Sequence, residues 1–415
     1  MKIFIRLSVM AMLLANALPV FAHSLPEPFQ STEHVIAGCA VKIQLKPGVP
    51  LSSDYLLHLP NGLLVSYGDI TMLAGDFYGI PEDDISGAGT PVEEEVRFVR
   101  SFDTLARDPN AVIEMPQILA IARDQEKEIE AGRQQGLGSE EIWHRLGDRY
   151  DRKWNCLTGG GCGVGWWLTP GRYLRLAEAD YDHFGADALR AYSAGHRVAL
   201  RMAVNAKKTG DTHQLELAHA MNAWACHYLA DHFAAGHLRI PRREMNGLVT
   251  PSLLGSALVP YMHTEENRNG LHVHNSRGDR WYAMGDNFYL DEKNRENQEQ
   301  ERRALQLSAD EVFAAYQTGV EASGHAVTEL VPEADETGFG GKTDIAPMFW
   351  LDASGRLQRR QHLQDLYDRE GTTDWWGWST LSILVAERGM PTVARTALAQ
   401  GNLRIEAKSY GISGF

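Results

Sequence analysis

The segment HYLADHFAAGH, residues 227–237, combines imidazoles and a carboxylate at a spacing that suits metal binding. In a helix, His227 and Asp231 would lie one turn apart on the same face, so that both could coordinate a single ion. His237 follows Gly236, at which we expect the helix to end, and can therefore reach a second ion nearby. A carboxylate between two ions can bind one with each oxygen, an arrangement that suits a multinuclear hydrolase.

The same residues have a simpler interpretation, in which the histidines are satisfied within the core or by solvent. For any single histidine that interpretation is the better one, so the prediction depends on the combination of His227, Asp231 and His237. His219 and His232 do not fit the spacing, and we expect both of them to be structural.

The segment that carries these residues has the apolar periodicity of a helix. Leu217, Met221, Trp224 and Tyr228 define one face, which predicts a helix over 213–235. The same periodicity predicts helices over 96–107, 110–134, 170–180, 185–208, 248–266, 296–323 and 375–400. Few segments alternate as strands do, although residues 271–285 could form a small hairpin. The predicted fold class is therefore mainly α, with long irregular loops.

The chain is acidic: its 54 Asp and Glu residues outnumber its 40 Lys and Arg residues, and the formal net charge is −14 over 415 residues. This balance argues against binding nucleic acid through a basic surface, but not against an enzyme that holds phosphate through metal ions. The length allows a large core, built as one extended domain or two. We expect one helical domain over 23–415, in which the helices from about residue 285 could form an extension, although no flexible linker marks a boundary there.

The first 22 residues have the features of a secretory signal peptide. Lys2 and Arg6 precede a short apolar stretch, and Val20-Phe21-Ala22 has the pattern of a cleavage site. The alternative is a buried N-terminal helix. Cleavage would remove 22 residues, two of them basic and none acidic, so that 393 residues with a net charge of −16 remain. This feature predicts a periplasmic or secreted protein.

Four cysteines in an exported chain permit disulfides. Cys156 and Cys162 bracket the segment NCLTGGGC, whose glycines allow the chain to turn back, so we expect these two residues to be joined. Cys39 and Cys226 could pair or remain thiols, and the sequence does not decide between these alternatives.

The HYLAD segment, with a histidine six residues after its aspartate, resembles the helix motif of the bacterial zinc-dependent phospholipases C and of the related single-strand-specific zinc nucleases. The segments YDHFGADALRAYSAGHRVAL and HFAAGHLRIPRR resemble a secreted phospholipase C subfamily. The resemblance covers roughly residues 29–320. It implies a phospholipase C/zinc nuclease-like helical bundle that holds three zinc ions in one cleft.

The resemblance also implies roles for individual residues. His34, which opens the first helix in STEH, is similar to the early histidine ligand of the family. His183, in DHF, is similar to the ligand that precedes the long helix leading to HYLAD, and it lies 44 residues before His227. The segment AGDFYGIP resembles the one whose aspartate lies near the attacking water, so Asp76 is expected to orient or deprotonate that water.

One ligand pair departs from the family pattern, which has a further histidine and a glutamate four residues later. Here YMHTEEN supplies His263 but has Asn267 at the fourth position. A helical i, i+3 pair can still chelate, so we assign His263 and Glu266 as ligands, with Glu265 as the substitute. The alternative is a polar helix end at the surface.

The mature N-terminus is a second departure. Members of the family bind one ion through the amine and carbonyl of an N-terminal tryptophan, and no tryptophan occurs here before Trp143. His23 would be the first residue after cleavage, and we assign it as the replacement ligand. His272 and His274 would share one face of a strand and are further candidates.

These features together predict a secreted zinc-dependent phospholipase C. It would cleave the glycerol-side phosphodiester bond of glycerophospholipids, releasing diacylglycerol and a phosphorylated head group. Zinc, with up to three ions, is the expected cofactor because the ligands mix imidazole with carboxylate. The expected partners are the phospholipid substrate and, through peripheral contact, the membrane surface, without nucleic acid.

Two other functions stay open. A zinc nuclease would share the motif, although nuclease relatives commonly continue it with a Gln-Pro-Leu-His-like turn where this chain has HFAAGH. A non-catalytic secreted helical protein could hold zinc for stability or sequestration, but it would not need a free carboxylate such as Asp76 beside an open coordination position. The aromatic group WWGW at 375–378 belongs either to the core or to a lipid contact.

Overall fold

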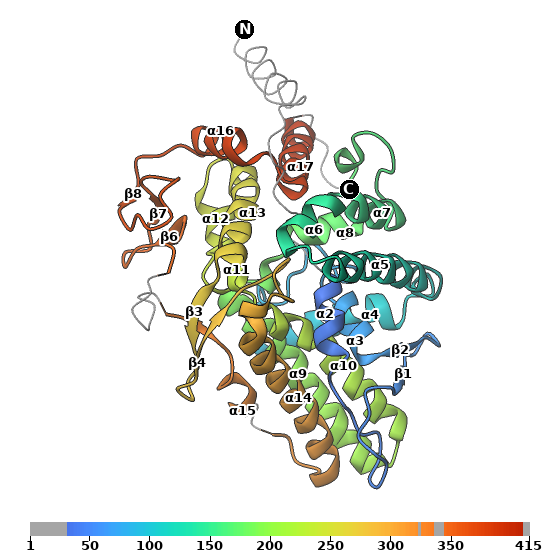
Figure 1. Cartoon of the computed structure of the whole chain (residues 1–415). Coiled ribbons are helices and arrows are strands. Elements are labelled where there is room, and N and C mark those ends of the chain that lie inside the picture. The colour runs from blue at the N-terminus through green and yellow to red at the C-terminus, as the bar shows by residue number, and fades with distance from the viewer. Residues whose placement is uncertain (1–30, 323–324, 336–343, 410–415) are drawn as a thin grey trace.

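α-Helices make up most of the chain, which confirms the predicted fold class, and the strands form only small sheets (Figure 1). The computed structural model describes residues 31–322, 325–335 and 344–409. The signal peptide predicted over 1–22 and the ligand predicted at His23 lie outside these residues. Among the helices of the described residues, none combines the length and the apolar character needed to cross a bilayer.

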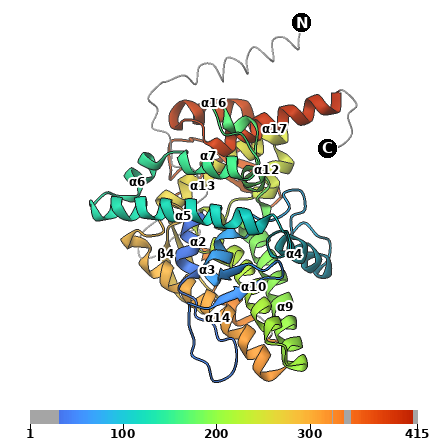
Figure 2. The same ribbon diagram turned by 90° about the vertical axis from the view of Figure 1, so that its right-hand side faces the viewer.

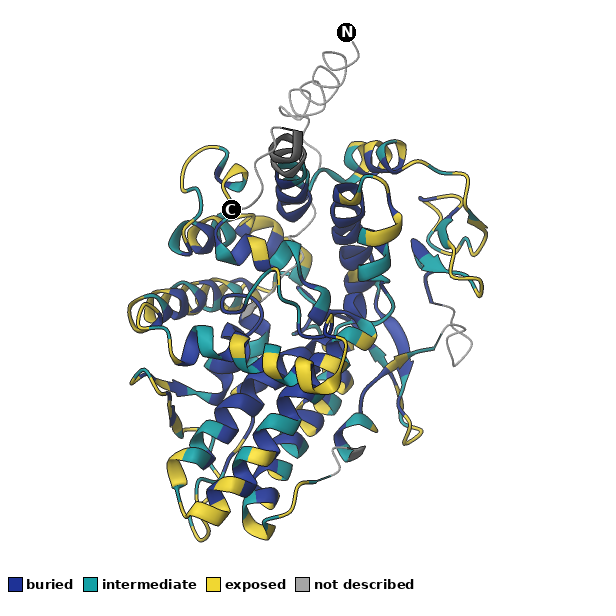
Figure 3. Ribbon diagram, turned by 180° about the vertical axis from the view of Figure 1, so that it is seen from behind, coloured by how far each residue is buried: buried dark blue, intermediate teal, exposed yellow. Residues whose placement is uncertain are grey.

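Three long helices pack against one another at the centre of the main core: α9 (Gly185–Thr209), α10 (Thr212–Asp231) and α14 (Arg295–Thr318). The facing sides of all three helices are buried, and the outer faces of α9 and α14 are exposed (Figure 3). Gly210 ends α9 with a positive φ of 71°, and the Asp211 side chain then caps α10 by accepting a backbone N–H. α10 is buried on nearly all sides towards its C-terminal end, so polar side chains there must find partners inside the protein.

Shorter elements cover α9 and α10 on one side. They are α2 (Ser31–Gly38), β1 (Leu56–His58), β2 (Leu64–Ser66), α3 (Tyr67–Leu73) and α4 (Pro91–Ala106). Thr90 caps α4 by accepting the N–H of Glu93, and Pro91 occupies the first turn, where a missing N–H costs nothing. α2 thereby comes to lie against both α3 and α10.

Helix α5 (Ala111–Gln134) crosses above α2 and α3 (Figure 2). It agrees within one residue with the helix predicted over 110–134. The elements that follow are α6 (Ser139–Leu146), α7 (Arg149–Leu157), η1 (Trp166–Leu168), α8 (Arg172–Glu178) and η2 (Tyr181–His183).

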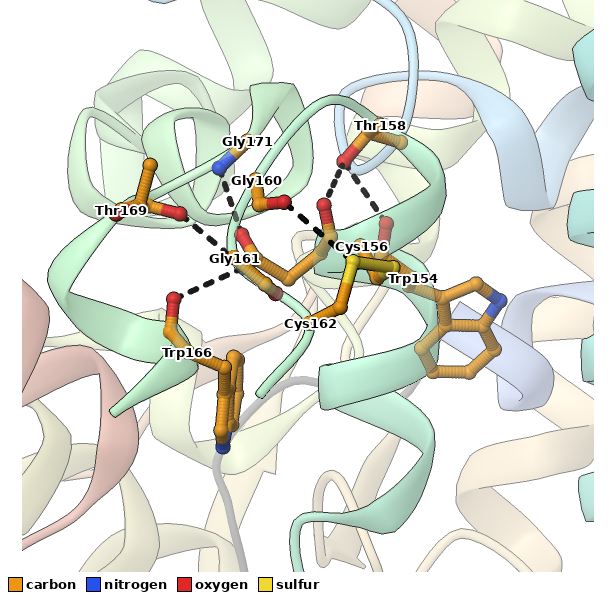
Figure 4. Close-up of a disulfide and its surroundings, with 10 residues drawn as sticks. Trp154, Cys156, Thr158, Gly160, Gly161, Cys162, Trp166, Thr169 and Gly171 are labelled. Atoms are coloured by element: carbon orange, nitrogen blue, oxygen red, sulfur yellow. Dashed lines mark hydrogen bonds between the residues drawn. A yellow bond between two sulfur atoms is a disulfide. The ribbon is translucent and has the colours of Figure 1, made fainter. Parts of the chain in front are cut away.

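The loop between α7 and η1 is closed by the Cys156–Cys162 disulfide, which confirms the predicted pairing (Figure 4). The Asn155 side chain holds this loop from the inside, because it donates to three backbone carbonyls and accepts one backbone N–H. Cys39 and Cys226 are free thiols, so the alternative in which they pair is not realised.

A second core forms between α12 (Arg242–Leu248), α13 (Ser252–Asn269) and the chain from Met348 onwards. That C-terminal part comprises β6 (Phe349–Leu351), β7 (Leu357–Arg360), β8 (Gly371–Thr372), α16 (Gly377–Arg388) and α17 (Thr392–Ser409). α14 packs in the main core, and the residues of the chain from Met348 onwards pack in the second core. Trp375 and Trp378 pack against the second core, whereas Trp376 is 62% exposed.

The hairpin predicted over 271–285 is present. β3 (Leu271–His274) pairs with β4 (Arg280–Ala283) and, on its other edge, with β5 (Glu333–Ala334). The short elements α11 (Ala235–Leu238), η3 (Glu292–Asn294) and α15 (His325–Thr328) complete the description.

Candidate metal centre

The buried histidines and aspartates meet around the C-terminal end of α10. This helix supplies His227 and Asp231 and ends there, earlier than the helix predicted over 213–235, so His237 lies on the separate short helix α11. The other predicted residues of the cluster arrive from α2 (His34), from the turn after α3 (Asp76), from η2 (His183) and from α13 (His263). The structure therefore brings together residues that are up to about 230 positions apart in the sequence.

Asp231 is central to the cluster, and its two carboxylate oxygens face different histidines. Oδ1 is 3.4 Å from Nε2 of His34 and 3.7 Å from Nδ1 of His237. Oδ2 is 3.1 Å from Nδ1 of His183 and 3.6 Å from Nε2 of His227. This is the geometry that a bridging carboxylate needs, although the bridging role itself stays a prediction.

Two backbone carbonyls fix the protonation of the rings. Nδ1 of His227 lies 2.9 Å from the carbonyl oxygen of Thr71, and Nδ1 of His237 lies 2.8 Å from that of His183. Because a carbonyl can only accept, each Nδ1 carries a proton and donates it, so that in the neutral ring Nε2 is the nitrogen with a free lone pair. The Nε2 atom of His227 points towards Nδ1 of His183 at 3.3 Å, and that of His237 towards Nε2 of His263 at 2.8 Å.

A second group consists of His237, His263 and Asp286. Oδ2 of Asp286 is 3.3 Å from Nε2 of His237 and 3.1 Å from Nε2 of His263. All three donors lie within 4.8 Å of one another. Asp286 was missed by the sequence analysis because it lies in the loop after β4, where no periodicity or motif marks it. The only signal was its position just after the predicted hairpin.

Glu266, which was assigned as the partner of His263, lies beside an arginine in the structure, and its role as a ligand stays a prediction. The Glu266 carboxylate accepts a hydrogen bond from Nε of Arg239 at 2.8 Å instead. Its substitute Glu265 pairs with Arg360 through both oxygens, at 2.8 and 3.0 Å. The reason is electrostatic, since buried guanidinium groups need these carboxylates as counter-charges.

Asn267 occupies the position at which the family pattern has a glutamate. Its Oδ1 accepts the N–H of Gly236 at 2.6 Å, and its Nδ2 lies 3.1 Å from Nε2 of His263. The amide thus connects α11 to α13 without supplying negative charge. In this structure the carboxylate beside His263 comes from Asp286.

The pairing of Glu265 with the buried Arg360 leads to a prediction. We expect Glu265→Gln to lower the free energy of unfolding by about 3–5 kcal/mol, because Arg360 would remain buried without its counter-charge. Zinc content should stay unchanged, since Glu265 belongs to none of the donor groups of the described residues. Urea denaturation and metal analysis test both expectations, with Glu141→Gln, in an exposed pair with Arg145, as the control that leaves stability unaltered. A stable variant that has lost zinc would make Glu265 a ligand after all.

Asp76 enters the cluster through a turn that only glycine permits. Gly75 has a φ of +69°, and a Cβ atom there would lie 2.8 Å from Nε2 of His227 and 2.9 Å from Cε1 of His183. This close approach brings the carboxylate of Asp76 within 4.8 Å of donor nitrogens on His34 and His227. Asp76 is therefore placed where it can act on a water in the cluster, and its role as the base stays a prediction.

The carboxylates dominate the electrostatics of the site. Burial would lower the pKa of His183, but Asp231 outweighs burial and raises that pKa to about 10. Burial likewise opposes the effect of Asp231 and Asp286 on His237, whose pKa rises to about 9. Burial would raise the pKa of Asp231, yet the surrounding histidines hold it well below its usual range. The aspartates thus remain ionised and require positive charge nearby, from protons or from metal ions.

The other histidines considered in the sequence lie elsewhere. Nε2 of His219 is 3.3 Å from the carbonyl oxygen of Gln44. His232 is buried but belongs to none of the metal-donor groups of the described residues. Burial lowers the pKa of both to about 4. His272 contacts Asp344 at 2.5 Å, and His274 is half-exposed on β3, so neither reaches the cluster.

The donor groups fit divalent cations. Oδ2 of Asp231 is buried and lies 3.1 Å from Nδ1 of His183, but it makes no hydrogen bond of good geometry, and a buried oxygen in that state costs free energy. Nε2 of His227 faces Nδ1 of His183, and Nε2 of His237 faces Nε2 of His263. Both nitrogens therefore lie beside other possible metal ligands. Mixed imidazole and carboxylate donors of this kind are typical ligands of zinc and related transition metals. The described residues thus contain several buried histidine and aspartate groups that can bind metal.

Comparisons with protein-family models, with curated proteins and with solved structures find no match to this chain. A function is therefore inferred from the chemistry of the cluster and from the resemblance of its motifs.

Proposed function

We propose that this protein is a zinc-dependent phosphodiesterase of the phospholipase C type, which hydrolyses the glycerol-side phosphodiester bond of glycerophospholipids. The observation that carries the proposal is the position of Asp231, whose oxygens stand between histidines from four different elements. A single structural zinc site needs four ligands and no shared carboxylate. The arrangement around Asp231 favours more than one ion in a common cluster.

The residues divide into three ion positions in this proposal. His183, His227 and Asp231 would hold one ion, and His237, His263 and Asp286 a second. His34 with the other oxygen of Asp231 would hold a third. When bound, the ions would supply Lewis-acid stabilisation of the phosphate charge and would lower the pKa of a water to about 7.

Within this arrangement the protein's own backbone and side-chain groups perform two tasks. The carbonyls of Thr71 and His183 keep the rings of His227 and His237 in the tautomer whose Nε2 can bind. Asp76 is nine-tenths buried at the edge of the cluster, and it would orient the attacking water and accept its proton. A site that bound zinc only for stability would have no need of this carboxylate.

Export and membrane contact belong to the same proposal. The predicted signal peptide and the Cys156–Cys162 disulfide support a periplasmic or secreted location. A phospholipid substrate lies in a bilayer, so we include peripheral contact with a lipid surface. The exposed Trp376 supports such a contact, whereas its neighbours Trp375 and Trp378 are partly buried in the second core.

The experiment that tests the function combines metal analysis with two substrates. We expect the purified protein to contain up to three zinc ions and to hydrolyse phosphatidylcholine or phosphatidylethanolamine vesicles, with activity lost on chelation and restored by zinc. Single-stranded DNA is the parallel substrate. Cleavage of DNA without cleavage of lipid would establish a zinc nuclease instead. Zinc binding without either activity would leave the non-catalytic alternative, and the absence of any stoichiometric transition metal would end the proposal.

A further inference from the structure

One donor group lies at the surface, away from the cluster around Asp231. It consists of His58, His213 and Glu216, each of which offers a donor atom within 4.8 Å of the other two. His213 and Glu216 belong to the first turns of α10, whereas His227, the first cluster residue on that helix, follows His213 by 14 residues. At about 1.5 Å of rise per residue, the two groups are about 20 Å apart along the helix.

The secondary structure fixes the backbone positions of the three residues. Asp211 caps α10 by accepting the N–H of His213 at 3.0 Å, so that His213 and Glu216, at i and i+3, share one face of the helix. His58 is the last residue of β1, which packs against α10, and its side chain is exposed while that of Leu57 is buried. Donors from a strand and from a helix therefore meet at one point of the surface.

Glu216 connects the group, because each of its carboxylate oxygens faces one of the rings. Oε2 accepts from Nδ1 of His58 at 2.6 Å and from the backbone N–H of the same residue at 3.3 Å. Oε1 lies 3.8 Å from Nδ1 of His213. The Glu216 side chain is only 13% exposed, whereas those of His58 and His213 are 59% and 77% exposed. A carboxylate held by the fold thus stands beside two imidazoles that solvent can reach.

The simpler interpretation of this group is a surface ion pair between His58 and Glu216. It accounts for one imidazole and leaves out the second, whose ring centroid is 5.9 Å from that of the first. His362 and Asp368 form a pair of the simpler kind, with 2.8 Å between Nδ1 and a carboxylate oxygen, and they belong to no donor group of the described residues. The second imidazole is therefore the feature that distinguishes the group on α10.

We propose that His58, His213 and Glu216 bind one exchangeable divalent transition-metal ion such as zinc. Imidazole nitrogens and a carboxylate oxygen are the ligands that zinc prefers outside thiolate sites. Bonds of about 2.0–2.1 Å at tetrahedral angles place ligand atoms about 3.3 Å apart, and the observed separations of 2.6 and 3.8 Å lie on either side of that value.

Binding would require a proton to leave and would keep one coordination position open. The ion replaces the proton between Nδ1 of His58 and Glu216, and that proton passes to solvent. Three protein ligands leave the fourth position to a water, and the exposure of both rings allows the ion to exchange. The bound ion would link β1 to the first turns of α10. The inference does not depend on the proposed hydrolysis of phospholipids.

The test is a calorimetric titration with zinc of the protein as it leaves gel filtration, together with the ions that it retains. We expect the wild type to take up one further zinc ion. His58→Ala, His213→Ala and Glu216→Gln should each weaken this uptake by at least about tenfold, because the loss of even an outer contact of a metal site costs that much. The zinc that each variant retains through gel filtration should equal that of the wild type.

The matched control is His362→Ala, which removes an exposed imidazole from a carboxylate at another place on the surface. Its uptake of zinc should equal that of the wild type, and thermal denaturation confirms that each variant is folded. No further uptake by the wild type, or undiminished uptake by His58→Ala and His213→Ala, would overturn the inference. A wild type that retains no zinc through gel filtration would refute the proposed function, and the difference between the wild type and His213→Ala would still decide this inference.

Discussion

Asp231→Asn is expected to lose zinc and phosphodiesterase activity together. The substitution preserves the shape of the side chain but turns a carboxylate that faces four histidines into a neutral amide. An amide cannot neutralise two ions, and its NH2 group would direct protons at the ring nitrogens that should bind them. We expect activity to fall by at least about 10²-fold, the effect of losing a major electrostatic contact in the transition state. Elemental analysis and initial rates on phosphatidylcholine measure the two losses.

His219→Ala and His232→Ala are the controls for Asp231→Asn. Both histidines are buried on or beside α10, yet neither belongs to a donor group of the described residues. Their zinc content should match that of the wild type even if the loss of packing lowers stability. Full zinc content in Asp231→Asn would show that the cluster does not depend on a shared carboxylate.

Asp76→Asn is expected to separate chemistry from metal binding. The variant should retain most of its zinc while the rate falls by on the order of 10²–10⁴, the range expected when a positioned base is removed. The structural reason is that Asp76 comes from its own turn, whereas His227 and Asp231 are fixed by α10 and do not need it. Zinc content and the rate on phosphatidylcholine should be measured on the same preparation.

Two outcomes would contradict this expectation for Asp76. A wild-type rate would mean that another group activates the water. A loss of zinc as complete as in Asp231→Asn would make Asp76 a ligand, which its distance from His34 and His227 also permits.

The helical part of the fold was accessible from the sequence, because long amphipathic or apolar segments have a strong periodic signal. The bounds of α5 and α9 agree within about one residue with the predicted segments 110–134 and 185–208. The end of α10 was placed too late, since residues 232–235 are as apolar as the helix before them. The segment predicted as one helix over 375–400 is two helices, because Gly389 and Pro391 interrupt it.

The cluster was accessible where helical spacing or a family motif marked its residues. His227 and Asp231 follow from helical spacing, while His34, Asp76 and His183 required the resemblance to a family. Asp286 could not be found in this way, because its place is set by a loop and by contacts with distant residues. The pairing of Glu266 with Arg239 was missed for a related reason, since Arg239 belongs to another part of the chain.

The two cores described above meet at the second donor group, which has a consequence for how the protein holds together. His263 stands on α13, among residues of the second core, whereas Asp286 is anchored on the main core through its neighbours. An ion bound to His237, His263 and Asp286 would act as a removable cross-link between them. Its binding free energy would then be shared by both cores, at about 2.7 kcal/mol when the free ion exceeds its dissociation constant a hundredfold. The stability of the whole molecule would therefore depend on the concentration of free zinc around it.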